Sequence, residues 1–554
     1  MKGNNYFQST NAEDEHLYEE ASSKEAVTRN GSCNNLADQT SPYANLDPNK
    51  LVDAYGFGLY QMLCHFLGNG VSFFYSSALY VMPYVGASPT LECVYQNQSL
   101  PVDTSCLISS KGDLLHGKCG VVENTSLIIK EPSYSTTLIK EFGLSCSSFV
   151  WKEAGLTAFT VGAVTMMPVL TSMADSHGRR PLILLALTIS ITCHMLASIA
   201  PNYYIFIFLR FLIGAASDTY YSLAYVHSCE ILPTSGRAWI TVVDSIAWVL
   251  GMFWVGILSL VVKQWRMMYF ACAAPGLATV AYYFFLPETP HWLIQHERYK
   301  EIENFVRIAN NSCKRVDLLP DEKHESLAAV LRSLRMLELL IINGFLELML
   351  AFYYFGLSFL SIDLSDDRFT AYMLSAFVEL PGGLLVVPLM LYMGRRNICM
   401  STMIMQGIAI IIAPLSQEPQ WFLVAFVLLG KLINSITYEV HPIYISEMAP
   451  TSVRSLFHSI INVPQSIGII IAPYLRHMDF GPKYTKYLIV GILCVISGAS
   501  CIFLPETRDC PLPPDIKAAS KYCFTHAKDK EKLMSKRQSE DTATLSEKES
   551  KSAE

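Results

Sequence analysis

The stretch Ala174-Asp175-Ser176-His177-Gly178-Arg179-Arg180-Pro181 decides the fold of this 554-residue chain, because a shorter form of it returns as Met393-Gly394-Arg395-Arg396. The two copies lie 216 residues apart, counted from Gly178 to Gly394. Two further stretches, 230–237 and 286–289, return 217 and 218 residues later, as 447–454 and 504–507. Because the three signatures recur in the same order and at nearly the same spacing, they indicate a duplicated unit.

Apolar runs of about 20 residues, each long enough to cross a bilayer as a helix, lie between these signatures. The chain is therefore predicted to be an all-α membrane protein with twelve transmembrane helices in two six-helix pseudo-repeats, an architecture that transporters use. We expect the spans at residues 56–82, 151–173, 181–200, 203–225, 238–260, 267–286, 336–361, 370–392, 397–415, 420–446, 454–475 and 485–504.

Composition agrees with a membrane protein. The chain is 51% hydrophobic and only 16% charged, whereas a soluble protein carries about 25% charged residues. Much of the acid behind the net charge of −7 lies in the polar tails. Residues 1–50 lack the apolar centre of a cleavable signal peptide, so the first span is expected to act as its own insertion signal.

The domain organisation follows from these spans. Residues 1–50 are predicted to be a disordered cytosolic tail, and 51–286 the first helical bundle, including a long loop at 83–150. Residues 287–335 form a charged cytosolic linker, 336–504 the second bundle and 505–554 a cytosolic tail rich in Lys, Glu and Ser.

The loop at 83–150 is expected to be extracellular. It holds four cysteines, Cys93, Cys106, Cys119 and Cys146, and two Asn-x-Ser/Thr sites, at Asn97 and Asn124. An even cysteine count beside glycan acceptors is typical of disulfides in an oxidising compartment, although which cysteines pair stays open. Most arginines between spans fall on the opposite side, which the positive-inside rule places in the cytosol. We expect a plasma-membrane protein with both termini cytosolic.

The repeated motifs resemble those of the major facilitator superfamily. Glu141-Phe142-Gly143-Leu144-Ser145-Cys146, the long cysteine-bearing loop and Pro287-Glu288-Thr289-Pro290-His291-Trp292-Leu293 resemble its organic ion transporter family. Members of that family carry organic cations, carnitine-like zwitterions or organic anions. The resemblance covers roughly residues 52–515.

The resemblance implies a gating latch at the cytosolic ends of the helices. Gly178 permits a tight turn, while Asp175 can pair with an arginine and stabilise one packing of the two halves. Because Met393 precedes Gly394, the second copy lacks the acid and the latch should be asymmetric. The expected gating residues are Asp175, Gly178, Arg179, Arg180, Glu230, Arg237, Gly394, Arg395, Arg396, Glu447 and Arg454.

Charged side chains inside spans each require a partner or a function, because ionised groups are costly in the bilayer. We expect Arg210 and Lys431 to form ion pairs with acids across the bundle, and direct contact with the substrate is the alternative for both. Asp218 is either the partner of Arg210 or a cavity residue. Asp244 is expected at a solvated mouth, and Glu347 near the interface.

The expected substrate cavity is acidic and aromatic. Glu379 matches a glutamate that lines the cavity in the cation and carnitine branches of the family, and Glu439 replaces a neutral polar residue. Pairing of either acid with Lys431, Arg210 or His441 is the alternative. Ser466 stands where cation transporters carry an aspartate and anion transporters an arginine. The expected cavity residues are Asp218, Tyr221, Trp248, Tyr354, Glu379, Glu439 and Ser466.

The sequence therefore predicts an alternating-access carrier of small organic cations or zwitterions in a lipid bilayer, with no cofactor, no catalytic or metal site and no nucleic-acid partner. Na⁺ or H⁺ is left open as a coupling ion. Two alternatives remain. One is an organic anion exchanger that uses Arg210, Lys431, His441 and His458 as counter-charges, and the other is a transport-inactive surface receptor that acts through the 83–150 loop.

Overall fold

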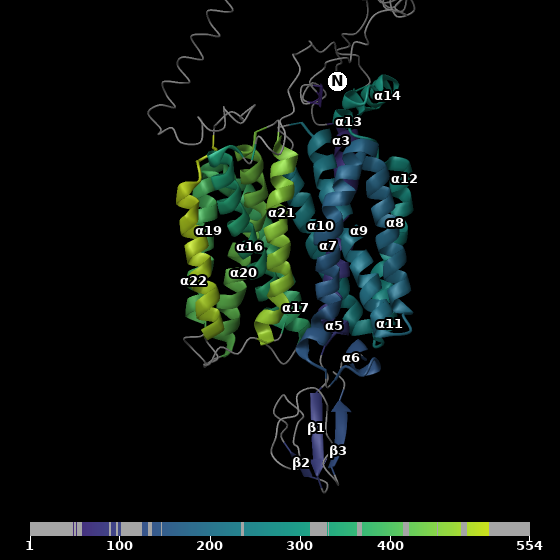
Figure 1. Ribbon diagram of the computed structural model, residues 1–554, viewed down its shortest axis with the longest axis vertical. Coiled ribbons are helices and arrows are strands. Elements are labelled where there is room, and N and C mark those ends of the chain that lie inside the picture. The colour runs from purple at the N-terminus through teal and green to yellow at the C-terminus, as the bar shows by residue number, and fades with distance from the viewer. Residues whose placement is uncertain are drawn as a thin grey trace, which may run out of the picture.

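The computed structural model describes residues 48, 51–52, 58–87, 90–95, 98–100, 125–130, 136–145, 147–233, 238–310, 330, 332–362, 368–413, 420–450, 453–477 and 485–508. Their long helices stand side by side as one bundle, and a small sheet projects from one end (Figure 1). We call that end the sheet side. The opposite end, which carries α13 (Pro290–Gln295) and α14 (Tyr299–Asn310), is the linker side.

The first half of the bundle consists of six helical rods in the described residues. The first rod is α3 (Leu59–Gly70), α4 (Ser72–Tyr80) and α5 (Met82–Val85), and the short helix α6 (Leu138–Glu141) precedes the second. The next four are α7 (Phe149–His177), α8 (Arg179–Ser198), α9 (Tyr203–Ile231) and α10 (Ala238–Val261). The sixth is α11 (Trp265–Ala273), the 3₁₀ helix η2 (Ala274–Ala281) and α12 (Tyr282–Phe285).

The second half repeats this plan. It begins with α16 (Leu334–Ile362), continues with α17 (Arg368–Phe377) and α18 (Glu379–Tyr392) as one broken rod, and then with α19 (Arg395–Ile412) and α20 (Gln420–Met448). The last two rods are α21 (Arg454–Ile471) with η5 (Ala472–His477), and α22 (Thr485–Ser500) with η6 (Cys501–Phe503). Proline explains two of the changes from α to 3₁₀ helix, since Pro275 and Pro473 cannot donate to the α-helical ladder.

Matching pairs of rods pack together in both halves, which confirms the predicted pseudo-repeat. α8 packs on α9 as α19 packs on α20, α10 packs on α4 as α21 packs on α16, and α11 packs on α8 as α22 packs on α19. Between the halves, α10 contacts α17 and α18, and α21 contacts α7. Residues of these helices that face the opposite half are therefore placed to form a shared central site.

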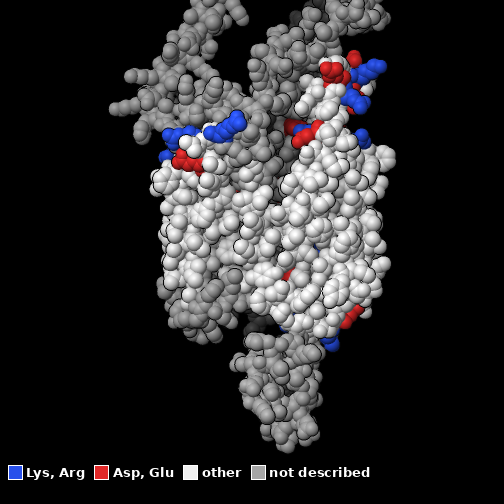
Figure 2. All heavy atoms as spheres, in the orientation of Figure 1, with Lys and Arg blue, Asp and Glu red and all other residues white. Residues whose placement is uncertain are grey.

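The surface of the bundle suits a lipid bilayer. Seven of the described helices are long and apolar enough to cross a membrane, and two shorter apolar helices accompany them. Large apolar side chains such as Phe208 and Phe284 face outward, 61% and 79% exposed. Figure 2 shows that the charged residues visible on one face gather near the two ends of the helices. The chain is a multi-pass membrane protein.

The loop between the first two rods contains an antiparallel sheet that the all-α prediction did not include. Its strand order is β2-β1-β3, in which β1 (Thr90–Tyr95) pairs with both β2 (Gln98–Leu100) and β3 (Thr125–Lys130). Cys93 of β1 lies opposite Leu100 and Leu127. The β-branched and apolar residues of β3 were a strand signal that the cysteines and glycan sites of this loop overshadowed.

On the sheet side, several contacts join the two halves. Thr157 of α7 is hydrogen-bonded to the Tyr474 hydroxyl of η5 at 2.7 Å, and the Tyr372 hydroxyl of α17 donates to the Met252 carbonyl of α10 at 3.1 Å. The Tyr84 and Tyr372 rings meet edge to face, with centroids 5.1 Å apart. The bundle is thus closed by polar and aromatic contacts at this end.

Candidate substrate site between the two halves

A buried ion pair lies in the second half. Glu379 is the first residue of α18, directly after the turn at Val378 that separates α18 from α17. The turn is possible because Pro381 leaves the carbonyl four residues earlier without its helical donor. Lys431 Nζ of α20 lies 2.7 Å from Glu379 Oε1, and both side chains are buried. The charge of Glu379 is therefore balanced within the protein.

Two further residues complete the surroundings of this pair. Lys431 also donates to the Ser375 hydroxyl, and the Tyr354 hydroxyl donates to Glu379 Oε2 at 2.8 Å. The Lys431 ammonium lies 5.8 Å from the centroid of the Tyr354 ring. Tyr354 thus links the ion pair to the first half, because Trp248 Nε1 donates to its hydroxyl at 2.9 Å.

Three other acids have hydroxyl partners instead of cations. Tyr75 donates to Asp218 at 3.1 Å, and Tyr221 donates to Asp244 at 3.2 Å, with Ser72 as a second donor. Ser245 of α10 donates to Glu439 of α20 at 2.5 Å, which joins the two halves. The ion pairs among the described residues include none of these three carboxyls. Three acids without a cation favour a positively charged ligand.

Aromatic rings from five helices line the same region. The Tyr75 ring stacks on Tyr221 at 5.0 Å between centroids and tilts against Trp248 at 5.6 Å. Trp248 meets Tyr354 at 6.3 Å, and Tyr354 meets Tyr438 at 5.0 Å. Tyr221, Trp248 and Tyr438 are only half-buried. Ring faces beside carboxylates attract organic cations, by about 0.5–2 kcal/mol per face.

Three residues of this wall were not among the expected cavity residues. Tyr75 belongs to the broken first rod, and Tyr438 directly precedes Glu439. Gln465 donates to the Tyr438 hydroxyl at 2.9 Å. The neighbouring Ser466, which was expected in the cavity, is bonded to the Asn462 carbonyl of its own helix at 3.0 Å. The two neighbours point in different directions because successive helical residues are about 100° apart.

Among the described residues Arg210 forms no ion pair, which corrects the prediction. Its guanidinium donates to the carbonyls of Gly155 and Ala78 at 3.2 and 2.9 Å, and to the Tyr269 hydroxyl at 3.0 Å. Asp218 lies eight residues further along the same helix, about 12 Å away along its axis, and has Tyr75 as its partner. Arg210 therefore ties α9 to three other helices of the first half, α4, α7 and α11.

Glu347 and His441 form a second buried contact that the sequence did not predict. His441 Nδ1 lies 2.9 Å from the Glu347 carboxylate, and its Nε2 lies 3.2 Å from the Asn343 side-chain oxygen. Glu347 is thus a buried residue rather than an interfacial one, and Asp244, expected at a solvated mouth, is also buried at 8% exposure.

The first copy of the gating motif forms a compact network on the linker side. Arg179 lies 3.0 Å from Asp175 and 3.4 Å from Glu230. The backbone N–H groups of Arg179 and Arg180, at the start of α8, donate to the Glu288 carboxylate at 3.0 and 3.2 Å. Gly178 has φ +107°, a conformation that favours glycine. The motif thus clamps the ends of α7, α8 and α9 to the segment after α12.

The second copy keeps the arginine contact without the aspartate. Arg395 lies 3.2 Å from Glu447, and Thr507 donates to the same carboxyl group at 2.5 Å. Glu506 occupies the place that Glu288 has in the first copy, because a Cβ at Gly394 would lie 2.1 Å from its carboxylate. Arg396 follows as the second residue of α19. The roles of Glu288 and Glu506 were missed, although both recur with their glycines at one offset.

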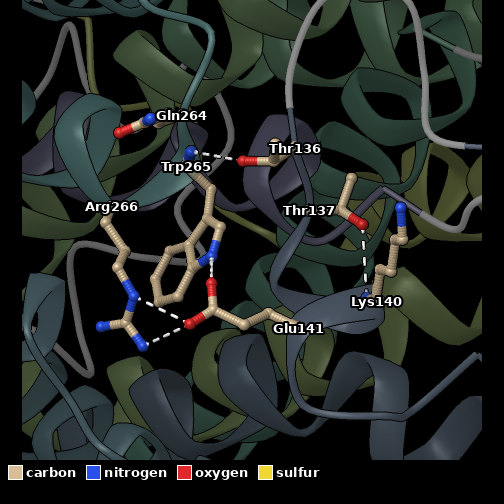
Figure 3. A pocket seen from close by; sticks show the side chains of 7 residues that line it. All are labelled: Thr136, Thr137, Lys140, Glu141, Gln264, Trp265 and Arg266. Atoms are coloured by element: carbon tan, nitrogen blue, oxygen red, sulfur yellow. Dashed lines mark hydrogen bonds and ion pairs between the residues drawn. The ribbon is translucent and has the colours of Figure 1, made fainter.

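On the sheet side, the predicted family motif at residues 141–146 contributes Glu141 to a surface pocket of about 410 Å³ (Figure 3). Glu141 accepts from Arg266 Nη2 at 2.6 Å and from the Trp265 indole. Burial alone would raise the pKa of this carboxyl group, but the Arg266 and Trp265 hydrogen bonds lower it below the ordinary value. Glu141 thereby fixes α6 to the first turn of α11.

Several predictions fall outside the described residues or side chains. They concern Arg237, Cys106, Cys119, Cys146, Asn97 and Asn124, together with the side chains of Cys93 and Arg454.

Comparison with known proteins identifies the family. Residues 131–473 match the family model of the Major Facilitator Superfamily. A Caenorhabditis elegans protein named as a candidate transporter is 38% identical over 490 residues, which cover 86% of this chain and 85% of that protein. The "Organic cation transporter 1" of the same organism is 28% identical, covering 80% and 79%. The human "Organic cation/carnitine transporter 2" is 25% identical, covering 69% and 72%.

The fold is shared with solved transporters. The inward-open xylose transporter XylE from E. coli superposes with a TM-score of 0.56 at 14% identity, covering 83% of this chain and 99% of that structure. At that identity the likeness concerns the fold alone. Together with the family match and the paired six-helix halves, it shows that this chain belongs to the Major Facilitator Superfamily of membrane transporters.

Proposed function

We propose that this chain is a plasma-membrane carrier of small organic cations or zwitterions that works by alternating access. The observation that carries the proposal is the set of three carboxyls, Asp218, Asp244 and Glu439, which have hydroxyl donors and no cation among the ion pairs of the described residues. They lie beside half-buried rings at the junction of the halves. A cation supplies the missing charge and binds the ring faces.

The relatives support the same class of substrate. One is named for organic cations and another for organic cations and carnitine, which is a zwitterion. For a zwitterion, the Lys431 ammonium beside the Tyr354 ring offers a partner for the substrate's carboxylate. We assign the linker side and both termini to the cytosol, and the contacts that close the sheet side then belong to a state closed to the exterior.

The anion exchanger has less support, because its expected counter-charges are engaged elsewhere. Arg210 is bound by carbonyls, Lys431 is paired with Glu379, and His441 is bound to Glu347. An anion would have to enter a region whose remaining charged groups are acids, and like charges repel strongly where water is scarce.

Uptake into transfected cells tests the proposal with three labelled probes, tetraethylammonium, carnitine and an aromatic carboxylate. We expect saturable uptake of the first or second, and at least a tenfold loss of kcat/KM in Asp218→Asn, equivalent to about 1.4 kcal/mol. Glu338→Gln, which changes an exposed acid on the linker side, is the matched control and should transport normally. Uptake of the carboxylate alone would establish the anion exchanger. No uptake despite normal surface delivery would favour the receptor.

A further inference from the structure

A continuous polar stripe runs along the first rod from the linker side to the middle of the bundle. Gln61, His65, Asn69, Ser72 and Ser76 follow one another at intervals of three or four residues, so they share one helical face. The turn at Val71 keeps a right-handed helical conformation, and the face therefore continues from α3 into α4. All five side chains are at most 2% exposed.

A hydrogen bond connects this stripe to one of the central acids, Asp244. The Asn69 amide nitrogen lies 2.7 Å from His65 Nδ1 and 3.2 Å from the Ser228 hydroxyl of α9. One turn further, Ser72 donates to Asp244 of α10. Asn69 and Ser72 are about 4.5 Å apart along the helix axis, a separation over which one water molecule could connect two polar groups.

Nearer the linker side, the stripe holds polar atoms that the described residues leave without a hydrogen-bond partner. Both amide atoms of Gln61 are buried and have no protein partner among the described residues. Buried amides in native proteins are hydrogen-bonded to protein or to ordered water, so Gln61 requires a solvent partner. A polar face that reaches from such a residue to a buried carboxyl group has the composition of a proton pathway.

At its inner end the stripe meets a pair of acids that belong to opposite halves. Asp244 is bound by groups of its own half, whereas the adjacent Ser245 donates to Glu439 of the other half. Because Glu439 accepts from the residue directly after Asp244, the two carboxyl groups lie near each other, and like charges repel where water is scarce. One added proton or one bound organic cation relieves this repulsion equally, so the two compete for the same site.

We propose that the carrier exchanges an organic cation for a proton, and that the proton moves between the linker side and Asp244 along this stripe. The proposal rests on the proposed function. When the linker side is open, one proton reaches Asp244 as one cation leaves. When the sheet side is open, the proton is released as the next cation binds. With one proton per monovalent cation, the cycle moves no net charge.

His65 is the residue of the stripe that carries an imidazole, whose two ring nitrogens can accept and donate a proton in turn, and this suits a relay. Other titratable groups lie on α3 and on the helices that pack against it. They include Tyr60 and Cys64 of α3 itself, Asp218, Tyr220, Tyr221, Tyr225, His227, Cys229 and Glu230 of α9, and Asp244 of α10, whereas α14 contributes the Phe305 ring to the cluster with Tyr60. Glu230 is engaged by Arg179, so Asp244 is the acid that the stripe serves.

The test uses the purified full chain in liposomes with a trapped pH dye, labelled tetraethylammonium or carnitine, and the membrane potential clamped to zero with valinomycin and equal potassium. With the lumen one pH unit more acidic than outside, we expect about tenfold accumulation of tetraethylammonium, since one pH unit corresponds to 1.36 kcal/mol. Adding the cation should make the lumen more alkaline. His65→Gln should slow proton-driven uptake at least fivefold and leave equilibrium cation binding unchanged.

His194→Gln is the matched control, because His194 is a buried histidine of the same half outside the stripe. If His65→Gln does not fold, Asn69→Ala interrupts the same pathway. Proton flux in the wild-type protein tests whether protons and cations are exchanged, without any variant. Cation uptake that ignores the pH gradient and moves no protons would overturn the exchange and leave the proposed function intact. Proton-coupled uptake that His65→Gln and Asn69→Ala leave unchanged would overturn the pathway. Absence of cation or carnitine binding would overturn the proposed function.

Discussion

The Glu288 carboxylate occupies the space that a side chain at position 178 would need, because a Cβ at Gly178 would lie 2.4 Å from Glu288 Oε2. The carboxylate accepts N–H groups from the first turn of α8, where the positive end of the helix dipole stabilises an anion. A glycine between α7 and α8 and a glutamate 110 residues later therefore form one unit.

Gly178→Ala should destabilise the protein by about 1–3 kcal/mol, since it adds both backbone strain and a clash. Two matched variants separate these causes. Gly394→Ala meets the Glu506 carboxylate without positive φ, whereas Gly143→Ala has φ +67° and open space around it. Thermal unfolding of purified variants should rank Gly178→Ala as the least stable. Equal stability of Gly178→Ala and Gly143→Ala would show that the Glu288 contact contributes nothing.

The Lys431–Glu379 pair predicts strong non-additivity. Either Lys431→Met or Glu379→Gln leaves a buried group without its partner, which costs about 3–5 kcal/mol when the remaining group stays charged. The double variant removes both charges and should lose much less than the sum of the single losses. A double-mutant cycle on unfolding free energies measures the coupling, and simple additivity would refute it. Cation uptake that Glu379→Gln lowers and the double variant restores would give Glu379 a positioning role.

Tyr474→Phe should favour opening of the sheet side. The variant removes the hydrogen bond to Thr157 that joins the halves, which is worth about 1 kcal/mol. The ratio of molecules open at the sheet side to molecules closed there should therefore rise about fivefold. Spin-label distances between the sheet-side ends of α7 and α21 report the shift. Tyr204→Phe is the control, because Tyr204 is an exposed tyrosine on the same surface. An unchanged distance distribution in Tyr474→Phe would mean that other contacts hold the gate.

Acid should weaken the Glu141 contacts. The folded pKa of this carboxyl group lies below its ordinary value, so its stabilising effect is present above the unfolded pKa of about 4.3 and is lost as pH falls through the folded value. Wild type should melt at a higher temperature than Glu141→Gln at pH 7, and the difference should shrink below pH 4. Glu338→Gln serves as control, because it removes a partly exposed carboxyl group that pairs with Arg335 on the linker side, far from Glu141. A constant difference at every pH would exclude ionisation as the cause.

Sequence reasoning predicted what depends on position along the chain. The repeat offset gave the two halves, and the scan for charges in apolar runs found Glu379, Lys431 and Asp218. It could not predict which side chains meet, because contacts between spans depend on helix rotation and depth. Arg210 therefore proved to bind carbonyls, and Tyr75 proved to be the donor to Asp218.

Two omissions had a signal in the sequence. Glu288 and Glu506 recur with Gly178 and Gly394 at nearly the same offset, which was a reason to connect them. The polar stripe of the first rod has helical spacing, but Gln61 and His65 carry no formal charge and a search for charged residues passes over them. Ser466 was chosen by likeness to relatives, and its neighbour Gln465 makes the contact with Tyr438.

Asp244 and Ser245 are consecutive residues of α10, but their hydrogen-bond partners belong to different halves of the molecule. Any rocking of one bundle against the other has to part Ser245 from Glu439, while Asp244 keeps its neighbours. If the proposed alternating-access cycle holds, this hydroxyl group is one of the contacts that set how fast the halves separate. Ser245→Ala removes only this oxygen atom. In the proposed cycle, one substitution is then a small evolutionary step from a slow carrier with tight coupling to a fast carrier with incomplete coupling.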